Sequence, residues 1–219
     1  MLTEHHLKNY EIDNLPIYRY KLGSNFCRHE FKNGGVCILV QEDLDFSPIS
    51  LDNYCKEKDI EVCAVMLKIT PIQLIILAIY RSLSGNFSNF LKNLDSITNT
   101  WHSIKVEFVI CGGININHLE NCNKRQQLDA PLQTYNLTGT VSFPTRKSKA
   151  SSTAIENIFK TRTKNYIINP HINGLSENEV QIIMIENTVL TNQTNKITTK
   201  RDINDQSTLE FQLLLSHEN

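Results

Sequence analysis

The stretch VEFVICGGININHLENC, residues 106–122, decides how the fold of this chain is interpreted. It begins with an apolar run, residues 106–111, which is typical of a buried strand, and the pair Gly112–Gly113 that follows predicts a turn. Loops that leave the carboxyl ends of buried strands are where layered α/β sheets place their chemistry. Asn115, a polar residue between two isoleucines, is therefore a candidate site residue.

Apolar segments on both sides of this stretch predict further strands and helices. IEVCAVMLKI (60–69) and IQLIILAIY (72–80) are expected to pair as a hairpin, because Pro71 between them marks a tight turn. Other strands are expected at 34–41 and near 154–160, 165–169 and 179–186, with helices over about 87–97, capped by Asn86, and 124–136. Apolar strands with covering helices favour a layered α/β sandwich.

The composition is that of a globular protein and excludes some classes of function. The 219-residue chain is 40% hydrophobic with a net charge of −1, so any attraction to nucleic acid must come from a local basic surface. The six cysteines lack C-x-x-C spacing, which argues against a zinc site and favours reduced, core-filling thiols. The N-terminus predicts no signal peptide, and no apolar run approaches the roughly 20 residues of a membrane span. We therefore expect an intracellular protein without a membrane partner.

The composition changes after about residue 186. Residues 187–206, NTVLTNQTNKITTKRDINDQ, are rich in Asn and Thr and have little to bury, which predicts a linker. Ser207 to Glu210 fits a capping box ahead of apolar residues, so a short helix is expected there. The predicted organisation is one domain over 1–186, followed by a polar linker with a short C-terminal helix over 187–219.

Six motifs occur in one order along the chain. They are LTEHHL (2–7), GGVCILV (34–40), IYRSLSGNFSNFL (79–91), FVICGGINI (108–116), FPTRKSKASSTAIENIF (143–159) and NGLSENEVQ (173–181). Their order and spacing resemble the endonuclease/exonuclease/phosphatase domain that opens the polyprotein of LINE-type (non-LTR) retrotransposons, particularly insect copies. The resemblance covers almost the whole chain to about residue 186, and the tail resembles the segment that links such a domain to a reverse transcriptase.

The resemblance implies a fold, an activity and a cofactor. The fold is a DNase I-like, four-layer α/β/β/α sandwich of two packed sheets, with the active site in loops at one end. The activity is Mg²⁺-dependent (or Mn²⁺-dependent) nicking of a DNA strand that then primes reverse transcription, by a domain expected to be monomeric. A metal held by carboxylates polarises the phosphate, while a base prepares the attacking water.

The resemblance also assigns individual residues. Glu4 stands where the family has its metal-binding glutamate, and Met1 lies only three residues before it. The family's first strand and the asparagine on it are therefore expected to be absent. Tyr80 and Arg81 match the loop that borders the DNA phosphates, although a tyrosine half buried at a strand end is an equal alternative for Tyr80.

Several positions depart from the family pattern. In the motif Gly-Asp-x-Asn, Gly113 replaces the aspartate that orients the water or leaving group, while Asn115 keeps the phosphate-contacting amide. Losing a positioned acid or base typically costs about 10²–10⁴-fold in rate. Glu156 replaces an aspartate, and Glu177 and Asn178 replace the aspartate and histidine of Ser-Asp-His. An amide neither titrates near neutral pH nor carries a positive charge.

The segment 143–166 is strongly basic and is expected beside the DNA groove, although a solvated face is the alternative. Glu179 is either a substitute carboxylate or a solvent-facing strand residue, and His118 is expected at the surface. The candidate catalytic residues are Tyr80, Asn115, Glu156 and Asn178, the candidate DNA-binding residues are Arg81, Arg146, Lys147 and Lys149, and the candidate metal ligands are Glu4 and Glu177.

Three functional hypotheses follow. The first is a truncated and degenerate retrotransposon endonuclease domain with the right fold and little or no nicking. The second is an active nuclease with altered geometry that uses Glu4, Glu156, Glu177 and Asn115 around the metal. The third is a non-catalytic nucleic-acid-binding domain that uses the basic segment. Salt-dependent binding without cleavage separates the third hypothesis from the second.

Overall fold

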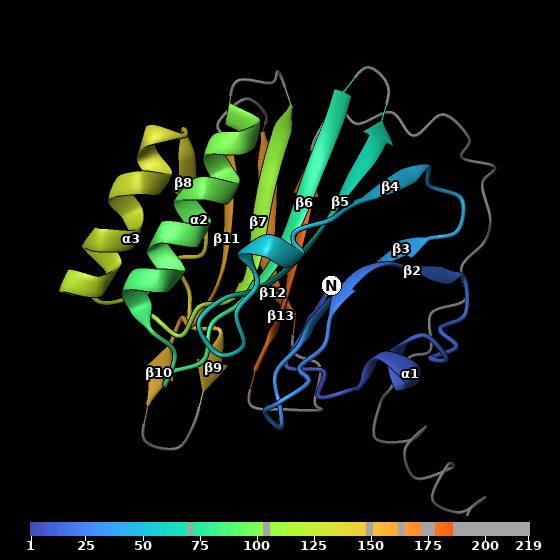
Figure 1. Ribbon diagram of the computed structural model, residues 1–219. Helices are drawn as coiled ribbons and strands as arrows, with labels where there is room; N and C mark the ends of the chain where they lie inside the picture. The colour runs from blue at the N-terminus through green and yellow to red at the C-terminus, as the bar shows by residue number, and fades with distance from the viewer. Residues whose placement is uncertain (70–71, 103–105, 148–150, 162–164, 172–177, 186–219) are drawn as a thin grey trace, which may run out of the picture. The chain divides into compact units, whose positions relative to one another are not determined.

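The hairpin predicted around Pro71 lies at the centre of the fold (Figure 1). The computed structural model describes residues 1–69, 72–102, 106–147, 151–161, 165–171 and 178–185. Within it, β5 (Glu61–Ile69) and β6 (Ile72–Tyr80) pair antiparallel along their whole length, which confirms the hairpin. Successive side chains of a strand point to opposite faces of its sheet. Both faces of β6 carry buried residues, as its continuous apolar run predicts.

The hairpin belongs to a six-stranded sheet with the order β4-β5-β6-β7-β11-β8. The added strands are β4 (Phe46–Ile49), β7 (Glu107–Gly113), β8 (Leu137–Gly139) and β11 (Glu156–Thr161). β6 and β7 run parallel, and every other neighbouring pair in this sheet is antiparallel. The carboxyl ends of β6 and β7 therefore lie beside the amino end of β11, at the same end of the sheet's strands.

Two helices, α2 (Phe87–His102) and α3 (Asn123–Thr134), cover one face of this sheet (Figure 1). Phe90, Leu94 and Leu128 from these helices pack with the sheet residues Ile75 and Leu77 in one buried core. The predicted cap of α2 is confirmed, because the backbone N–H of Asn89 donates to the side-chain oxygen of Asn86 at 3.0 Å.

The opposite face of the large sheet packs on a second layer of strands. This layer contains the sheet β1-β3-β2 and the hairpin β12-β13. Its strands are β1 (Leu2–Thr3), β2 (Tyr20–Phe26), β3 (Val36–Gln41), β12 (Tyr166–His171) and β13 (Val180–Ile185). Ile38 and Val40 of β3 share a core with Val65 of β5, and Ile168 and Ile183 pack against that core.

The helix α1 (Asn9–Ile12) lies on the outer side of the second layer. Ile12 is buried with Cys27 and Cys37, and Cys37 points away from the inter-sheet core because its neighbours Val36 and Ile38 point into it. The order of layers is helices, sheet, sheet and helix. This confirms the predicted α/β sandwich of two packed sheets.

The remaining elements are short. A two-stranded ladder joins β9 (Arg146–Lys147) to β10 (Ser152–Thr153), and a 3₁₀ turn spans Asp52–Tyr54. All six cysteines are free, as predicted. No helix in the described ranges has the length and apolar character that a membrane crossing requires.

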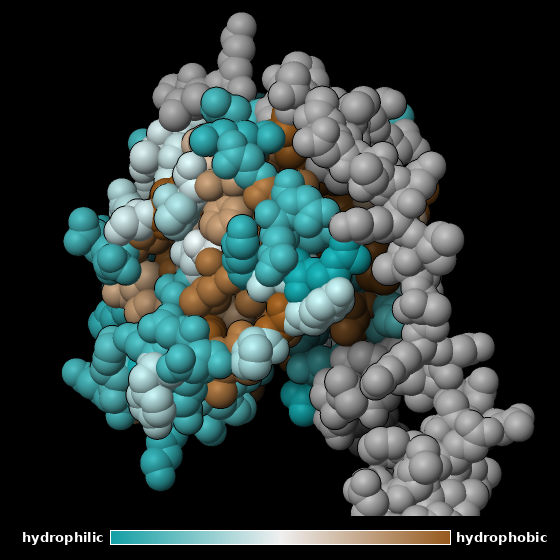
Figure 2. Space-filling model, turned by 90° about the vertical axis from the view of Figure 1, so that its right-hand side faces the viewer, coloured by the Kyte–Doolittle hydropathy of each residue, from teal (hydrophilic) through white to brown (hydrophobic). Residues whose placement is uncertain are grey.

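The described residues all lie in the structural unit Met1–Val189. The boundary predicted at residue 186 stays a prediction, and the expected helix in the tail lies outside the described residues. Figure 2 shows the side that carries β2, β4 and α1, where hydrophobic side chains reach the surface between hydrophilic ones. Such scattered apolar exposure is normal for a folded domain.

The glycine pair after the central strand behaves differently from the prediction. β7 continues through Gly112 and Gly113, so the turn expected at the pair is wrong. Gly112 has φ +144°, and a Cβ atom there would meet the carbonyl oxygen of Ile79 at 1.9 Å. Gly113 has no such constraint, because a Cβ atom would lie 3.4 Å from the ring of Tyr80, an ordinary packing distance. The backbone therefore requires glycine at 112 and tolerates a side chain at 113.

We expect Gly112→Ala to lower the free energy of unfolding by about 1–3 kcal/mol or more, because it combines an unfavourable φ with a clash against β6. Gly113→Ala is the matched control and is expected to change stability by less than about 1 kcal/mol. Urea unfolding followed by circular dichroism measures both. Equal losses in the two variants would contradict the assignment.

Candidate active site

The ends of three neighbouring strands bring three of the predicted positions together. In the sheet register, Tyr80 on β6 lies opposite Gly113 on β7, and Gly113 lies opposite Glu156 on β11. These residues are far apart in the sequence, and only strand pairing makes them neighbours. The glycine stands between a phenol and a carboxylate.

Glu4 joins this group from the second layer. The Tyr80 hydroxyl donates to Glu4 Oε1 at 2.6 Å. The backbone of Glu4 has φ +53°, and its N–H donates to the carbonyl of Gly35 at 2.8 Å. Tyr80 is buried, and burial together with the Glu4 carboxylate raises the pKa of its phenol well above the ordinary value. Tyr80 is therefore a neutral hydrogen-bond donor at physiological pH.

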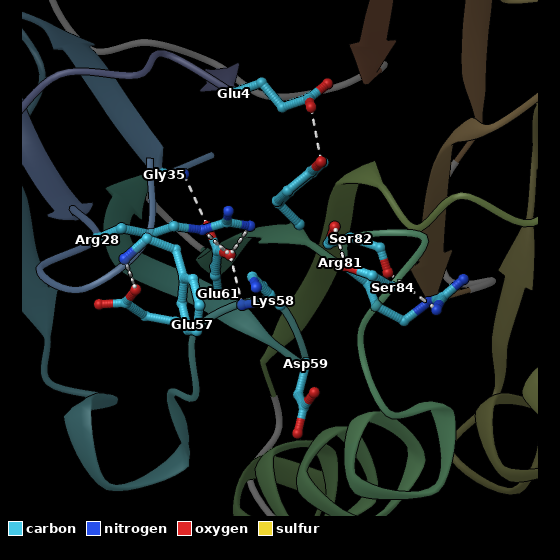
Figure 3. Close-up of polar contacts among 12 residues, drawn as sticks. Glu4, Arg28, Gly35, Glu57, Lys58, Asp59, Glu61, Arg81, Ser82 and Ser84 are labelled. Carbon is cyan, nitrogen blue, oxygen red and sulfur yellow. Dashed lines mark hydrogen bonds and ion pairs between the residues drawn. The ribbon is translucent and has the colours of Figure 1, made fainter. Parts of the chain in front are cut away.

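A buried ion pair supports the Glu4 segment. The Glu61 side chain is 0% exposed and accepts hydrogen bonds from Arg28 Nε at 2.6 Å, from Gly35 N at 2.7 Å and from Lys58 N at 2.9 Å (Figure 3). The Glu61 carboxylate holds Gly35 through the Gly35 backbone N–H, and the Gly35 carbonyl in turn accepts a hydrogen bond from the Glu4 backbone N–H. The position of the candidate metal ligand is thus set by a carboxylate on β5.

Glu156 is oriented by Thr145, which is completely buried. The Thr145 hydroxyl donates to Glu156 Oε2 and accepts from the backbone N–H groups of Ile155 and Glu156 at 3.2 and 3.3 Å. The sequence pattern FPTRKSK (143–149) contains Thr145 but predicts no role for it. Its only sequence signal is a hydroxyl residue between a proline and a basic run.

Burial raises the pKa of the Glu156 carboxyl, while the Thr145 hydroxyl and the positive charge of Arg146 lower it, and the negative charge of Glu4 makes the smallest contribution, raising it. The Glu4 and Glu156 carboxylates therefore interact only weakly, and a cation near both would be attracted to each.

Asn115 and Arg81 form reciprocal hydrogen bonds between the side chain of one residue and the backbone carbonyl of the other. Asn115 Nδ2 donates to the carbonyl of Arg81 at 2.7 Å, and the Arg81 guanidinium donates to the carbonyls of Ile114 at 2.9 Å and Asn115 at 3.1 Å. Arg81 is only 1% exposed. Its guanidinium is turned inward, so the structure favours a role in shaping the loop after β7 over the predicted contact with DNA.

The basic segment meets the last predicted motif beside Thr145. Asn178 forms an isolated β-bridge with Arg146, and Glu179 N donates to the carbonyl of Thr145 at 2.7 Å. Lys147 Nζ forms an ion pair with Glu179 Oε1 at 2.7 Å. Glu179 is thus a partner of the basic segment, and its side chain is only 12% exposed and lies before β13, so the alternative of a solvent-facing strand residue is wrong. The predicted residues Lys149 and Glu177 lie outside the described residues.

His118 was expected at the surface, and this expectation is wrong. The residue is 6% exposed, and its ring packs edge-on against Phe159 with centroids 5.5 Å apart. Burial lowers its pKa to about 4, so the imidazole is neutral at pH 7. The reason is that the chain turns back after Ile116, and His118 N donates to the carbonyl of Ala154 at 2.9 Å.

No protein-family model matches this sequence, and no curated protein matches it. Solved structures do. The endonuclease domain of TRAS1, a telomere-specific non-LTR retrotransposon, is similar with a TM-score of 0.63 and 12% identity, over 77% of this chain and 79% of that one. An endonuclease/exonuclease/phosphatase family protein from Leptotrichia buccalis C-1013-b has a TM-score of 0.51 and 12% identity, over 76% and 72%. This chain has the endonuclease/exonuclease/phosphatase fold.

The resemblance to this fold's nucleases implies a divalent cation, and the residues present can be compared with its needs. No three His, Cys, Asp or Glu side chains gather into a metal-binding group in the part of the chain that the structure describes. Mg²⁺, however, is commonly bound through one or two carboxylates together with water and phosphate oxygens. Glu4 and Glu156 supply two interacting carboxylates. The donor chemistry fits Mg²⁺ or Mn²⁺, and these two residues would hold it.

The raised pKa of Glu156 predicts a pH-dependent cost to folding. Because the folded state binds this proton more tightly, stability should fall as pH rises from the unfolded value of 4.5 through the higher folded pKa. We expect Glu156→Gln to gain stability relative to the natural protein across this window. Urea unfolding with EDTA between pH 4 and 7 measures the difference. Glu42→Gln, at an exposed site, is the control and should show a pH-independent difference.

Proposed function

We propose that this chain is a retrotransposon-derived DNA-binding domain of the endonuclease/exonuclease/phosphatase fold, with strongly impaired phosphodiester cleavage. One observation carries the proposal. Gly113 stands in register between Tyr80 and Glu156, at the position where the family resemblance expects an aspartate. The hydrogen bond from Tyr80 to Glu4 and that from Thr145 to Glu156 support the proposal that these residues are the framework of a phosphodiesterase site without its central acid.

The residues around this gap have separate tasks. Glu4 and Glu156 would hold a divalent cation, which supplies polarisation of a phosphate and stabilisation of the leaving oxygen when it is bound. Tyr80 donates its hydroxyl hydrogen to Glu4 and so directs that carboxylate. Thr145 directs Glu156 in the same way. Asn115 holds the loop after β7 through Arg81.

Two substitutions account for the impairment. At position 113, no carboxylate orients the attacking water or the leaving group, and a lost acid or base costs about 10²–10⁴-fold. At position 178, asparagine cannot carry a proton near neutral pH. The neighbouring Glu179 does not replace these groups, because its carboxylate is paired with Lys147.

DNA is the proposed partner, and the basic segment is the proposed contact. Arg146 and Lys147 are exposed next to Thr145 and Glu156, and Lys149 follows them in the sequence. The protein is proposed to act as an intracellular monomer, derived from a polyprotein with a reverse transcriptase after this domain. The interacting carboxylates Glu4 and Glu156 favour one alternative, a weakly active metal-dependent endonuclease.

The first experiment is nicking of supercoiled plasmid by the folded protein with Mg²⁺ or Mn²⁺. We expect the natural protein to be inert and Gly113→Asp combined with Asn178→His to nick, with a gain of about 10²-fold or more. An aspartate fits at 113 because its Cβ atom would lie 3.4 Å from the Tyr80 ring.

Gly113→Asn combined with Asn178→His is the matched control, since it fills the same space without the charge, and it should stay inert. Nicking by the natural protein that disappears in Glu4→Gln would contradict the impairment and favour the active alternative. Salt-dependent DNA binding without nicking in any variant would favour a purely binding role.

Metal binding can be measured without activity. A cation that binds only the folded state stabilises it, by about 1.4 kcal/mol at ten times its Kd, or roughly 3–6 °C in Tm for a domain of this size. We expect Mg²⁺ or Mn²⁺ to raise the Tm at pH 7, Glu4→Gln to abolish the rise, and the control Glu42→Gln to keep it. A rise that survives Glu4→Gln would place the cation elsewhere.

A further inference from the structure

A basic cavity lies beside the candidate active site. Its volume is about 220 Å³, and it is formed by the segment after Glu4 and the loop between β2 and β3. The lining residues are His6, Leu7, Lys8, Arg28, Phe31, Lys32, Asn33 and Gly34. Lysine, arginine and histidine make up half of these residues, and none of them is acidic. Arg28 is paired with Glu61, and the Glu57 carboxylate accepts from backbone N–H groups of the same loop, so the positive charge left without an ion pair comes from Lys8 and Lys32.

Arg28 is held rigidly at this cavity. It is 7% exposed and is paired with the fully buried Glu61. A Cβ atom on Gly34 would meet the Arg28 guanidinium carbon at 2.4 Å, so glycine is required for the loop to close onto the arginine. The ion pair and the close approach fix the shape of this part of the cavity.

Lys8 ties the two walls together. Its Nζ donates to the carbonyl of Arg28 at 2.7 Å and lies 3.4 Å from the carbonyl of His29. An ammonium has three donors, so at least one remains for a ligand. The Lys8 ammonium contacts neutral carbonyls and forms no ion pair in the described ranges, and the Glu11 carboxylate accepts from the Lys8 backbone N–H at 2.7 Å.

Lys32 supplies a second uncompensated cation. Its side chain is exposed, and among the described residues it forms neither a hydrogen bond nor an ion pair. Lys8 and Lys32 both line the cavity, and the Lys8 ammonium lies against the loop that carries Lys32, at the carbonyls of Arg28 and His29. A phosphate group, with several strong acceptor oxygens, is the ligand that such an arrangement favours.

The cavity shares its frame with the candidate metal ligand. Glu4 N donates to the carbonyl of Gly35 at 2.8 Å, and His6 N donates to the carbonyl of Gly34 at 2.9 Å. Glu4 and His6 both have left-handed backbone conformations, with φ of 53° and 60°. The same short ladder thus carries the carboxylate that faces Tyr80 and the histidine that lines the cavity.

We propose that this cavity binds a phosphate of the nucleic-acid strand, next to the phosphate at the candidate active site. A water molecule takes up about 30 Å³, so the cavity has room for a phosphate and several waters. The inference rests on the proposed function in taking DNA as the partner, and it adds a second anchoring point for the strand. The cavity would add to the contact proposed for Arg146 and Lys147 of the basic segment.

The test uses two probes. Inorganic phosphate, titrated against sodium chloride of equal ionic strength, should shift the backbone NMR signals of residues 6–8 and 32–34. Lys32→Gln should weaken this binding by roughly threefold or more. For duplex DNA, the same variant should lower the slope of log K against log salt by about 1 and weaken binding to every sequence alike. Lys92→Gln, on the exposed side of α2, is the matched control and should change neither.

The outcomes separate this proposal from the proposed function. DNA binding with an unchanged salt slope in Lys32→Gln, together with phosphate shifts outside the cavity, would overturn the cavity proposal and leave the proposed function standing. Absence of DNA binding would overturn the proposed function and the strand-anchoring role together. Phosphate shifts at residues 6–8 that are lost in Lys32→Gln, with the reduced DNA slope, support both.

Discussion

The buried carboxylate of Glu61 is the interaction on which the rest of the site depends. It lies at 0% exposure and is surrounded by donors from two segments, Arg28 and Gly35 in the loop between β2 and β3 and Lys58 before β5. A buried charge of this kind contributes little net stability, but removing one partner costs about 3–5 kcal/mol because the other is left uncompensated. The pair therefore determines which arrangement of loops is possible. Glu61 also lies opposite Tyr80 in the hairpin, so the same residue adjoins both sides of the site.

Glu61 influences the site through two routes, a hydrogen bond to Gly35 and the strand register with Tyr80. Through Gly35, the ion pair positions Glu4 and the neighbouring basic cavity. Through the sheet register, Tyr80 is followed by Gly113 and then by Glu156. Separate hydroxyl groups hold the two carboxylates, that of Tyr80 for Glu4 and that of Thr145 for Glu156. The proposed impairment follows from the glycine that lies in register with Tyr80 and Glu156.

Pattern reasoning succeeded where a local rule controls the outcome. The hairpin at 60–80 follows from two apolar runs around Pro71, and the start of α2 follows from the capping side chain of Asn86. It failed where a long-range contact controls the outcome. Gly112 looks like a turn residue, yet it is glycine because β6 passes too close for a side chain. His118 looks like a surface residue, but the chain folds back and buries its ring against Phe159.

Residue types, their order and their hydrophobic periods predict most of the elements and the two-sided burial of the central strand β6. These properties are local, so they are readable along the chain. The tertiary structure decided which of the candidate residues meet. It placed Glu4 on Tyr80, turned Arg81 inward and recruited Thr145 to Glu156. Such contacts depend on strand register and on the compensation of buried charge, and neither leaves a periodic signal in a sequence.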